Sequence, residues 1–295
     1  NADSSIPFGT IFTGMMLVQL FYWGTNQAII QRALGAKNLK EGQKGLLFAA
    51  VLKILGPLIV VLPGIIAFHM FGDSLTNPDE AYPLLVKKVL PVVLVGFFAA
   101  VLFGAILSSF NSALNSSVTL FGLGIYKEYV NKDADEQTIV KAGKKFGTVL
   151  AVVSMCIAPL LIYASDGLFA YLQEVNGIYS IPILTIIVVG YMTKYVPAIA
   201  AKIGIISGSV LYIISQFIIK PYVIGKDDYP HFLHVMAILF ALNVFIMLLI
   251  GKFYPREVEY NQKYTEQVDI QPWKYGLLTG IVICVIVISS FLYFS

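Results

Sequence analysis

Apolar residues in this chain fall into eight long runs that are separated by short polar connections. A helix needs about 20 mainly apolar residues to cross the hydrocarbon core of a bilayer. The runs long enough to do so are residues 8–30, 45–71, 91–125, 146–164, 168–192, 203–220, 232–250 and 275–294. No run alternates apolar and polar residues as a membrane β-barrel strand does, and in lipid the backbone must satisfy its own hydrogen bonds. The pattern therefore predicts an all-α integral membrane protein with about eight transmembrane helices.

Three of these runs are expected to depart from a single straight helix. Residues 91–125 are too many for one crossing, so we expect a span followed by an interfacial helix through "GIYKEYV", residues 124–130. In the first run, Gly24 is expected to interrupt the helix. In the second run, Pro57 and Pro63 are expected to loosen it, because proline removes a backbone donor.

The composition supports a membrane protein and excludes several other classes. Hydrophobic residues make up 58% of the 295 residues and charged residues only 13%, whereas soluble domains carry roughly 25% charge. The net charge of +3 comes without a Lys- or Arg-rich tract, which argues against a nucleic-acid partner. Cys156 and Cys284 lie singly within apolar runs, which argues against a disulfide framework and a cysteine metal site, and the three histidines lack metalloprotease-like spacing.

The distribution of Lys and Arg predicts the orientation of the spans. Fifteen of the 20 Lys and Arg residues lie in the connections 31–44, 126–145, 193–202 and 251–274. Since positive residues mark the cytoplasmic side, these connections are expected inside, and residue 1 and the C-terminus outside, in a multi-pass protein of the cell (inner) membrane. The first residues, "NADSSIPFGT", have no initiator Met and no signal sequence, so we expect an opened extracellular loop of a longer protein.

The first span carries an unusual group of polar and aromatic residues in "QLFYWGTNQ", residues 19–27. Gln19, Tyr22 and Trp23 lie in its inner half, beside the interruption expected at Gly24. Such a broken helix can line a cavity with its freed backbone groups. The alternative is an interfacial aromatic belt, although Tyr22 lies about two turns from the end of the span.

Two further spans carry polar residues at membrane depth. Lys53 lies eight residues into its span, about 12 Å deep, and an intramembrane lysine is a candidate for function unless it pairs with a carboxylate of another helix. Gln173 lies about 8 Å deep in a helix that Gly177 and Pro182 make breakable. Its neighbour Glu174 is interpreted as a carboxylate at the membrane boundary and is a weaker candidate for a functional residue than Gln173.

The segment "FGAILSSFNSALNSS", residues 103–117, concentrates small and polar residues in an apolar run. On a helix, Ala105, Ser108, Ser109 and Ser112 share one face. This spacing is common in close helix packing, and serine can also bond to the carbonyl four residues earlier. Alternatively, the two hydroxyls of Ser108 and Ser109 and the carbonyl of Ala105 form half of a site for sodium, which takes about five or six oxygen ligands.

Together these residues resemble the sodium–solute symporter family, most of all its sodium/galactose and sodium/glucose members. The resemblance rests on "FYWGTNQAIIQRALGAKNLKEGQKG", Lys53, "GAILSSFNSALNSS", "IYKEY" and "YLQEVNG", and it runs from about Ile6 to Gly190. It implies part of a LeuT-type transporter built from two inverted five-helix repeats. Residues 8–192 would be the second repeat and residues 193–295 three accessory helices, with the N-terminal repeat absent from this chain.

The resemblance also implies roles for individual residues. The backbone of Ala105 and the hydroxyls of Ser108 and Ser109 match the sodium ligands. Sugar-binding residues are matched by Lys53 and Gln173. Tyr22 resembles the gate that stacks on the sugar, with Trp23 beside it. Gln19 stands where the galactose transporter has an asparagine, which leaves the identity of the sugar open.

The leading hypothesis is therefore sodium-coupled symport of a sugar or polyol by alternating access, with sodium as the co-transported ion. The alternative within the family is a non-sugar solute, such as inositol, proline or sialate. An enzyme is not expected, because the chain shows no metal-ligand spacing, acid–base pair or nucleophile elbow. A channel would need a continuous polar pore instead of separate polar clusters.

Overall fold

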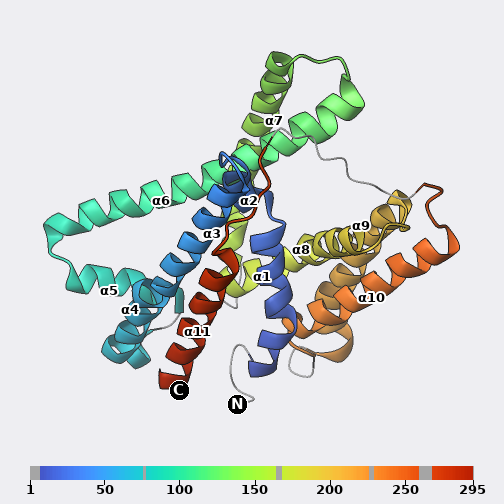
Figure 1. The fold of residues 1–295 in the computed structure, drawn as a ribbon. Helices are drawn as coiled ribbons and strands as arrows, with labels where there is room; N and C mark the ends of the chain where they lie inside the picture. Colours follow the sequence, from blue (N-terminus) through green and yellow to red (C-terminus); the bar gives the residue numbers. More distant parts are fainter. Residues whose placement is uncertain (1–6, 76–77, 164–167, 226–228, 259–267, 295) are drawn as a thin grey trace. The chain divides into compact units, whose positions relative to one another are not determined.

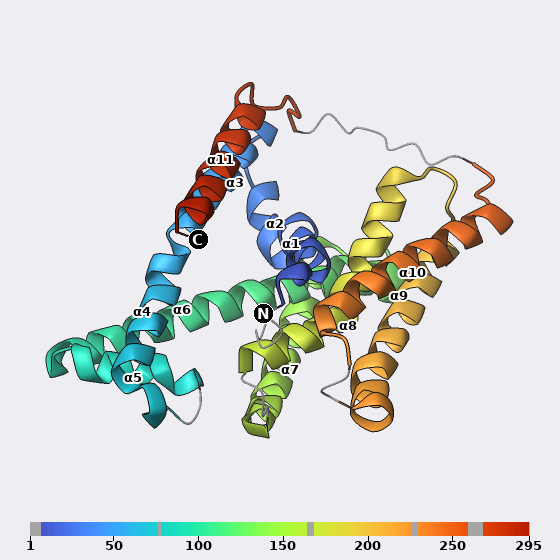
Figure 2. The same ribbon diagram turned by 90° about the horizontal axis from the view of Figure 1, so that it is seen from below.

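The computed structural model describes residues 7–75, 78–163, 168–225, 229–258 and 268–294 (Figures 1 and 2). Every regular element in these ranges is a helix, which confirms the all-α prediction. Within the same ranges, six helices are long and apolar enough to cross a membrane: Leu39–Phe71, Val92–Val130, Glu136–Leu160, Tyr171–Met192, Ala198–Ile224 and Phe232–Phe253. The other two predicted runs differ, because 8–30 is divided into shorter helices and the last helix has a shorter apolar stretch, Gly276–Ser290.

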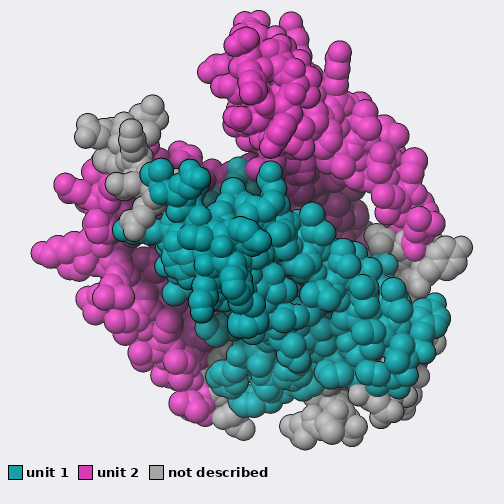
Figure 3. Space-filling model, turned by 90° about the vertical axis from the view of Figure 1, so that its right-hand side faces the viewer, with its two compact units in different colours: residues 1–30, 169–265 teal, residues 31–168, 266–295 magenta. Residues whose placement is uncertain are grey.

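The helices form two compact units, which Figure 3 colours separately. Unit 1 comprises residues 1–30 and 169–265, and unit 2 comprises residues 31–168 and 266–295. Each unit thus combines segments that lie far apart in the sequence. The predicted division into a transport repeat, residues 8–192, and accessory helices, residues 193–295, follows chain order and stays a prediction.

Unit 1 packs four helices around apolar core clusters, of which the larger joins all four helices. The helices are α1 (Gly14–Gly24), most of α8 (Leu168–Met192), α9 (Ala198–Ile213) with its π-helical extension η6 (Ile214–Ile224), and α10 (Phe232–Phe253). Val18, Ile181, Tyr212, Leu233 and Met236 meet in the core, one or two from each of these elements. Van der Waals contacts among these buried side chains are the main favourable contribution to packing of the four helices against one another.

Unit 2 contains the remaining long helices. They are α3 (Leu39–Ile54), α4 (Gly56–Phe71), α5 (Ala81–Val89), α6 (Val92–Thr119) with its π-helical extension η4 (Leu120–Val130), α7 (Glu136–Ile157) and α11 (Gly276–Phe294). A Cβ at Gly147 of α7 would lie 2.7 Å from Val118 of α6, so the absent side chain lets the two helices approach. The helix α11 lies beside α3 in both views, and the backbone amide of Trp273 donates to Gln43 Oε1 at 2.6 Å (Figures 1 and 2).

Two predicted interruptions are confirmed. α1 ends at Gly24, and α2 (Gln27–Leu34) begins after a turn in which Asn26 Oδ1 accepts a hydrogen bond from the Ala28 amide at 3.0 Å. The helix is likewise interrupted at Leu55, between α3 and α4, with Pro57 in the first turn of α4 and Pro63 inside it. Proline is tolerated in a first turn because its missing amide has no partner there.

Two other helices are more regular than their sequences indicate. α6 continues through η4 to Val130, and an interfacial position of residues 124–130 stays a prediction. The ring of Phe121 stacks on Phe146 of α7 at 4.2 Å, which gives this extension a packing partner. α8 is one continuous helix through Pro182, which is buried and whose side chain lies against Gly208 of α9.

The fourth predicted run, residues 146–164, begins too late. α7 starts at Glu136, where the side chain of Asp135 accepts a hydrogen bond of 3.2 Å from the Thr138 amide and caps the helix. Hydrogen bonding from Thr138 lowers the pKa of the Asp135 carboxyl below its ordinary value. Residue 164, where the fourth run was expected to end, lies outside the described residues. Residues 1 and 295 lie outside them as well, and the orientation of the two chain ends stays a prediction.

Candidate functional site

The three residues matched to sodium ligands lie together on α6. Ala105, Ser108 and Ser109 all fall within the regular part of this helix, and all three are exposed. Their spacing of three and four residues therefore places them on one face, as the sequence predicts. Ser108 also lines a cleft of about 700 Å³ in unit 2, together with Gln31, Arg32, Gly104, Leu107, Asn111, Ser112 and Asn115.

Ser112 forms hydrogen bonds both within α6 and with α2. Its hydroxyl donates a 3.0 Å hydrogen bond to the backbone carbonyl of Ser108, four residues earlier. The guanidinium of Arg32 donates to the same hydroxyl, and Gln31 Nε2 donates to the Ser112 carbonyl at 3.4 Å. Of the alternatives open for the serine face, back-bonding to the helix is thus present at Ser112. Ser116, one turn further along α6, is buried.

Sequence reasoning missed Gln31 and Arg32 as neighbours of α6. Both belong to α2, and Asn115 Nδ2 also donates to Gln31 Oε1 at 3.4 Å. The available signal was their position in "IIQR", directly after the interrupted first span. These amide and guanidinium contacts attach α2 to the polar half of α6.

The residues matched to the gate lie on the exposed side of α1. Phe21 is buried and packs edge-on against Tyr179 of α8, with ring centroids 6.0 Å apart. Tyr22 is 38% exposed, and its ring lies 5.5 Å from that of Trp23 at an interplanar angle of 82°. Gln19 and Trp23 line a mainly apolar depression of about 430 Å³ in unit 1. The helix is thus anchored through Phe21, while Gln19 and Tyr22 are exposed and Trp23 is half-buried.

The remaining predicted solute residues lie in different units. Lys53 is exposed in the last turn of α3, in unit 2, two residues before the interruption at Leu55. A cation in this position is favoured by the partial negative charge of the helix C-terminus. Gln173 is half-buried on α8, in unit 1. Gln19, Tyr22 and Trp23 of α1 belong to the same unit.

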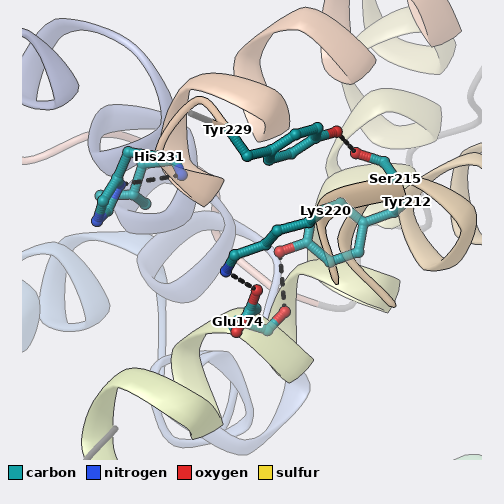
Figure 4. Close-up of polar contacts among 7 residues, drawn as sticks. Glu174, Tyr212, Ser215, Lys220, Tyr229 and His231 are labelled. Atoms are coloured by element: carbon teal, nitrogen blue, oxygen red, sulfur yellow. Dashed lines mark hydrogen bonds and ion pairs between the residues drawn. The ribbon is translucent and has the colours of Figure 1, made fainter. Parts of the chain in front are cut away.

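The residue after Gln173 has a partner that sequence reasoning did not find. Glu174 Oε1 lies 2.8 Å from Lys220 Nζ of η6, and the hydroxyl of Tyr212 donates to the Glu174 carbonyl at 2.9 Å (Figure 4). Ser215 and Tyr229 share a further hydrogen bond of 2.6 Å, which holds η6 to the segment before α10. Lys220 is the last residue of the predicted apolar run 203–220, and a charge in this position was the feature of the sequence that could have indicated a partner for Glu174.

Comparison with known proteins identifies a family. The sequence profile described as "SSF: Sodium:solute symporter family" matches residues 3–208. The chain is 48% identical over 269 residues to the "Uncharacterized symporter YidK" of Escherichia coli (strain K12), covering 91% of this chain and 46% of that protein. It is 39% identical to the "Sodium/glucose cotransporter" of Vibrio parahaemolyticus, covering 66% of this chain and 38% of that protein. It is 31% identical to the human "Sodium/myo-inositol cotransporter 2", covering 85% of this chain and 41% of that protein. The chain thus spans less than half the length of each of these relatives.

Proposed function

Because this chain belongs to the sodium:solute symporter family, we propose that it forms part of a transporter in which sodium entry drives uptake of a sugar or polyol. The observation that carries the proposal is the family match over residues 3–208, which contains every candidate sodium, solute and gate residue. The matched family and relatives are transporters, so the prediction that the chain is not an enzyme is confirmed.

Sodium is the proposed coupling ion, and α6 is its proposed binding helix. The carbonyl of Ala105 and the hydroxyls of Ser108 and Ser109 supply three neutral oxygens from one exposed helix face. Neutral oxygens are suitable ligands for a hard cation, and about two or three more would complete its shell. Those ligands are proposed to come from a first repeat of the same protein.

The solute is proposed to be polyhydroxylated. Lys53, Gln173 and Gln19 provide the donors and acceptors that sugar hydroxyls require, and the ring of Tyr22 provides an apolar face for stacking, with Trp23 beside it as part of the gate. The printed names of two relatives, a sodium/glucose and a sodium/myo-inositol cotransporter, support this class of solute. A different solute of the same family, such as proline or sialate, is the alternative.

Transport is proposed to follow a LeuT-type alternating-access cycle in the cell membrane. Residues 8–192 act as the second inverted repeat, residues 193–295 as accessory helices, and residue 1 and the C-terminus face outside. A membrane potential supplies about 2.3 kcal/mol per charge per 100 mV. Coupling requires that sodium bind the solute-competent state more tightly than the other state.

The test is uptake by the complete transporter reconstituted in vesicles. An inward sodium gradient should drive accumulation of at least one labelled compound from a panel of sugars, inositol, proline and sialate, and a potassium gradient should not. Counterflow of labelled solute separates a transporter from a channel, because a simple channel gives none. Absence of sodium-dependent accumulation across the panel would overturn the proposal, and accumulation of proline or sialate alone would replace its solute.

A further inference from the structure

Three side chains of α9 and η6 hold the N-terminal half of α8. Ser209 Oγ donates to the Ile178 carbonyl at 2.9 Å, Tyr212 Oη donates to the Glu174 carbonyl at 2.9 Å, and Lys220 Nζ lies 2.8 Å from Glu174 Oε1 (Figure 4). We refer to Ser209, Tyr212 and Lys220 as the α8 clamp. All of its contacts lie within unit 1, and two of them reach backbone carbonyls that already belong to a regular helix.

The clamp combines a buried tyrosine with two half-buried side chains, Ser209 and Lys220. Tyr212 is only 1% exposed, and a Cβ at Gly177 would collide with its ring, so the glycine makes room for the tyrosine. The side chains of Lys220 and Glu174 are 24% and 18% exposed. Both charges lie on helices that are apolar enough to cross a membrane. Removing either charge leaves the other without its partner in a partly buried position, which is unfavourable.

The local backbone explains how Lys220 lies in this position. α9 changes to π-helical geometry at Ile214, and Pro221 follows Lys220 directly. Proline has no amide hydrogen and crowds the carbonyl four residues earlier, and a wider π-turn accommodates it. The Ser215–Tyr229 hydrogen bond of 2.6 Å also holds this segment at its other side. Lys220 is therefore presented from an anchored segment.

We propose that Glu174 and Lys220 are positioning residues for solute binding, acting through Gln173. This inference rests on the proposed function, in which Gln173 contacts the solute. Successive residues of an α-helix differ by about 100° around the axis. Pairing of Glu174 with η6 therefore sets the rotation of α8 and, with it, the direction in which Gln173 extends. The Glu174–Lys220 ion pair differs from an ordinary packing contact because it constrains the rotation of α8 at the residue next to Gln173.

The test compares neutral and charge-exchanged variants of the complete transporter. Glu174→Gln and Lys220→Gln should each raise the apparent solute KM by roughly threefold to tenfold, the effect of weakening the neutral hydrogen bond proposed between Gln173 and the solute. The sodium half-saturation measured at saturating solute should stay within about twofold, which is within the range of surface substitutions. The exchanged pair Glu174→Lys with Lys220→Glu should recover most of the solute affinity.

Lys44→Gln is the matched control. Lys44 and Glu41 also lie 2.8 Å apart, but they are neighbours on α3 with side chains 40% and 48% exposed. An exposed pair of this kind contributes little, so this variant should keep the wild-type solute KM.

The amount of inserted protein and the Tm in detergent are measured for every variant, so that folding is separated from binding. A lowered Tm with unchanged solute KM in both neutral variants would mean that the pair only holds the helices together, which overturns the positioning role. Failure of the exchanged pair to recover solute affinity contradicts it as well. Absence of sodium-dependent uptake by the unmodified transporter would instead overturn the proposed function, and the positioning role with it.

Discussion

The hydroxyl of Ser112 donates a 3.0 Å hydrogen bond to the backbone carbonyl of Ser108, one turn earlier on α6. The same hydroxyl accepts a hydrogen bond from Arg32 of α2. Both serines line the cleft, but Ser112 is half-buried and engaged in contacts within the protein, whereas Ser108 is exposed. This difference divides the polar residues of α6 into a candidate ion-binding part and a part that holds neighbouring helices.

The first prediction concerns sodium activation. Ser108→Ala and Ser109→Ala should each raise the sodium half-saturation tenfold or more, comparable to losing an interaction of about 1.5–3 kcal/mol with a charge. The reason is that a methyl group cannot replace a hydroxyl oxygen around a dehydrated cation. Uptake is titrated with sodium at saturating solute.

Ser112→Ala and Ser116→Ala are the controls for this prediction. Ser112 bonds to its own helix and to Arg32, and Ser116 is buried. Alanine at these positions should change expression or thermal stability more than sodium dependence. A shift of sodium half-saturation in these two variants, with none in the Ser108 and Ser109 variants, would make the assigned site wrong.

The second prediction concerns Lys53. Lys53→Ala should raise the apparent solute KM tenfold or more, since a hydrogen bond to a charged group is worth about 1.5–3 kcal/mol. Lys252→Ala is the matched control, because Lys252 is also exposed in the last turn of a helix, α10, outside the candidate residues. Equal solute KM values for the Lys53 variant and the wild type would exclude Lys53 as a ligand.

The third prediction separates a gate from a lipid-facing ring at Tyr22. Tyr22→Phe should retain stacking and much of the uptake, whereas Tyr22→Ala should lose most of it. The control is Tyr191→Ala, since Tyr191 is 80% exposed near the end of α8. Similar uptake by the Phe and Ala variants of Tyr22 would show that the ring serves only packing.

The fourth prediction concerns the packing of α9 on α8 and α10. A Cβ at Gly208 would lie 2.7 Å from Asn243 Nδ2 and 2.8 Å from Pro182 Cγ, and Asn243 already donates to the Gly204 carbonyl at 3.0 Å. Gly208→Ala should therefore destabilise the protein by about 1–3 kcal/mol through overpacking. The measurement is Tm in detergent.

Gly190→Ala is the matched control for this packing prediction. Among the described residues outside the adjacent backbone of α8, no heavy atom lies within 4 Å of a Cβ added at Gly190. Alanine also favours a helix over glycine by about 1 kcal/mol. Its Tm should stay the same or rise. A Gly208 variant as stable as the Gly190 variant would show that the neighbours of Gly208 move aside without loss.

The sequence contained the features that depend on local covalent properties. Long apolar runs predicted an all-α membrane protein, and the backbone properties of Gly24 and Pro57 marked two interruptions that the structure confirms. The helical period placed Ala105, Ser108 and Ser109 on one face of α6. These predictions succeed because each requires only the residues within a few turns.

The tertiary structure alone decided the features that depend on contacts between distant segments. Glu174 pairs with a lysine 46 positions away, and Arg32 contacts Ser112 across 80 positions. In the same way, α6 extends to Val130 through a segment in which Phe121 stacks on Phe146. α8 stays continuous through a buried Pro182. Hydropathy and helical period state which residues share a face, but not which other helix covers that face. The partner of a charge or a proline is set by how side chains of separate helices fit together, and this is why those features required the folded chain.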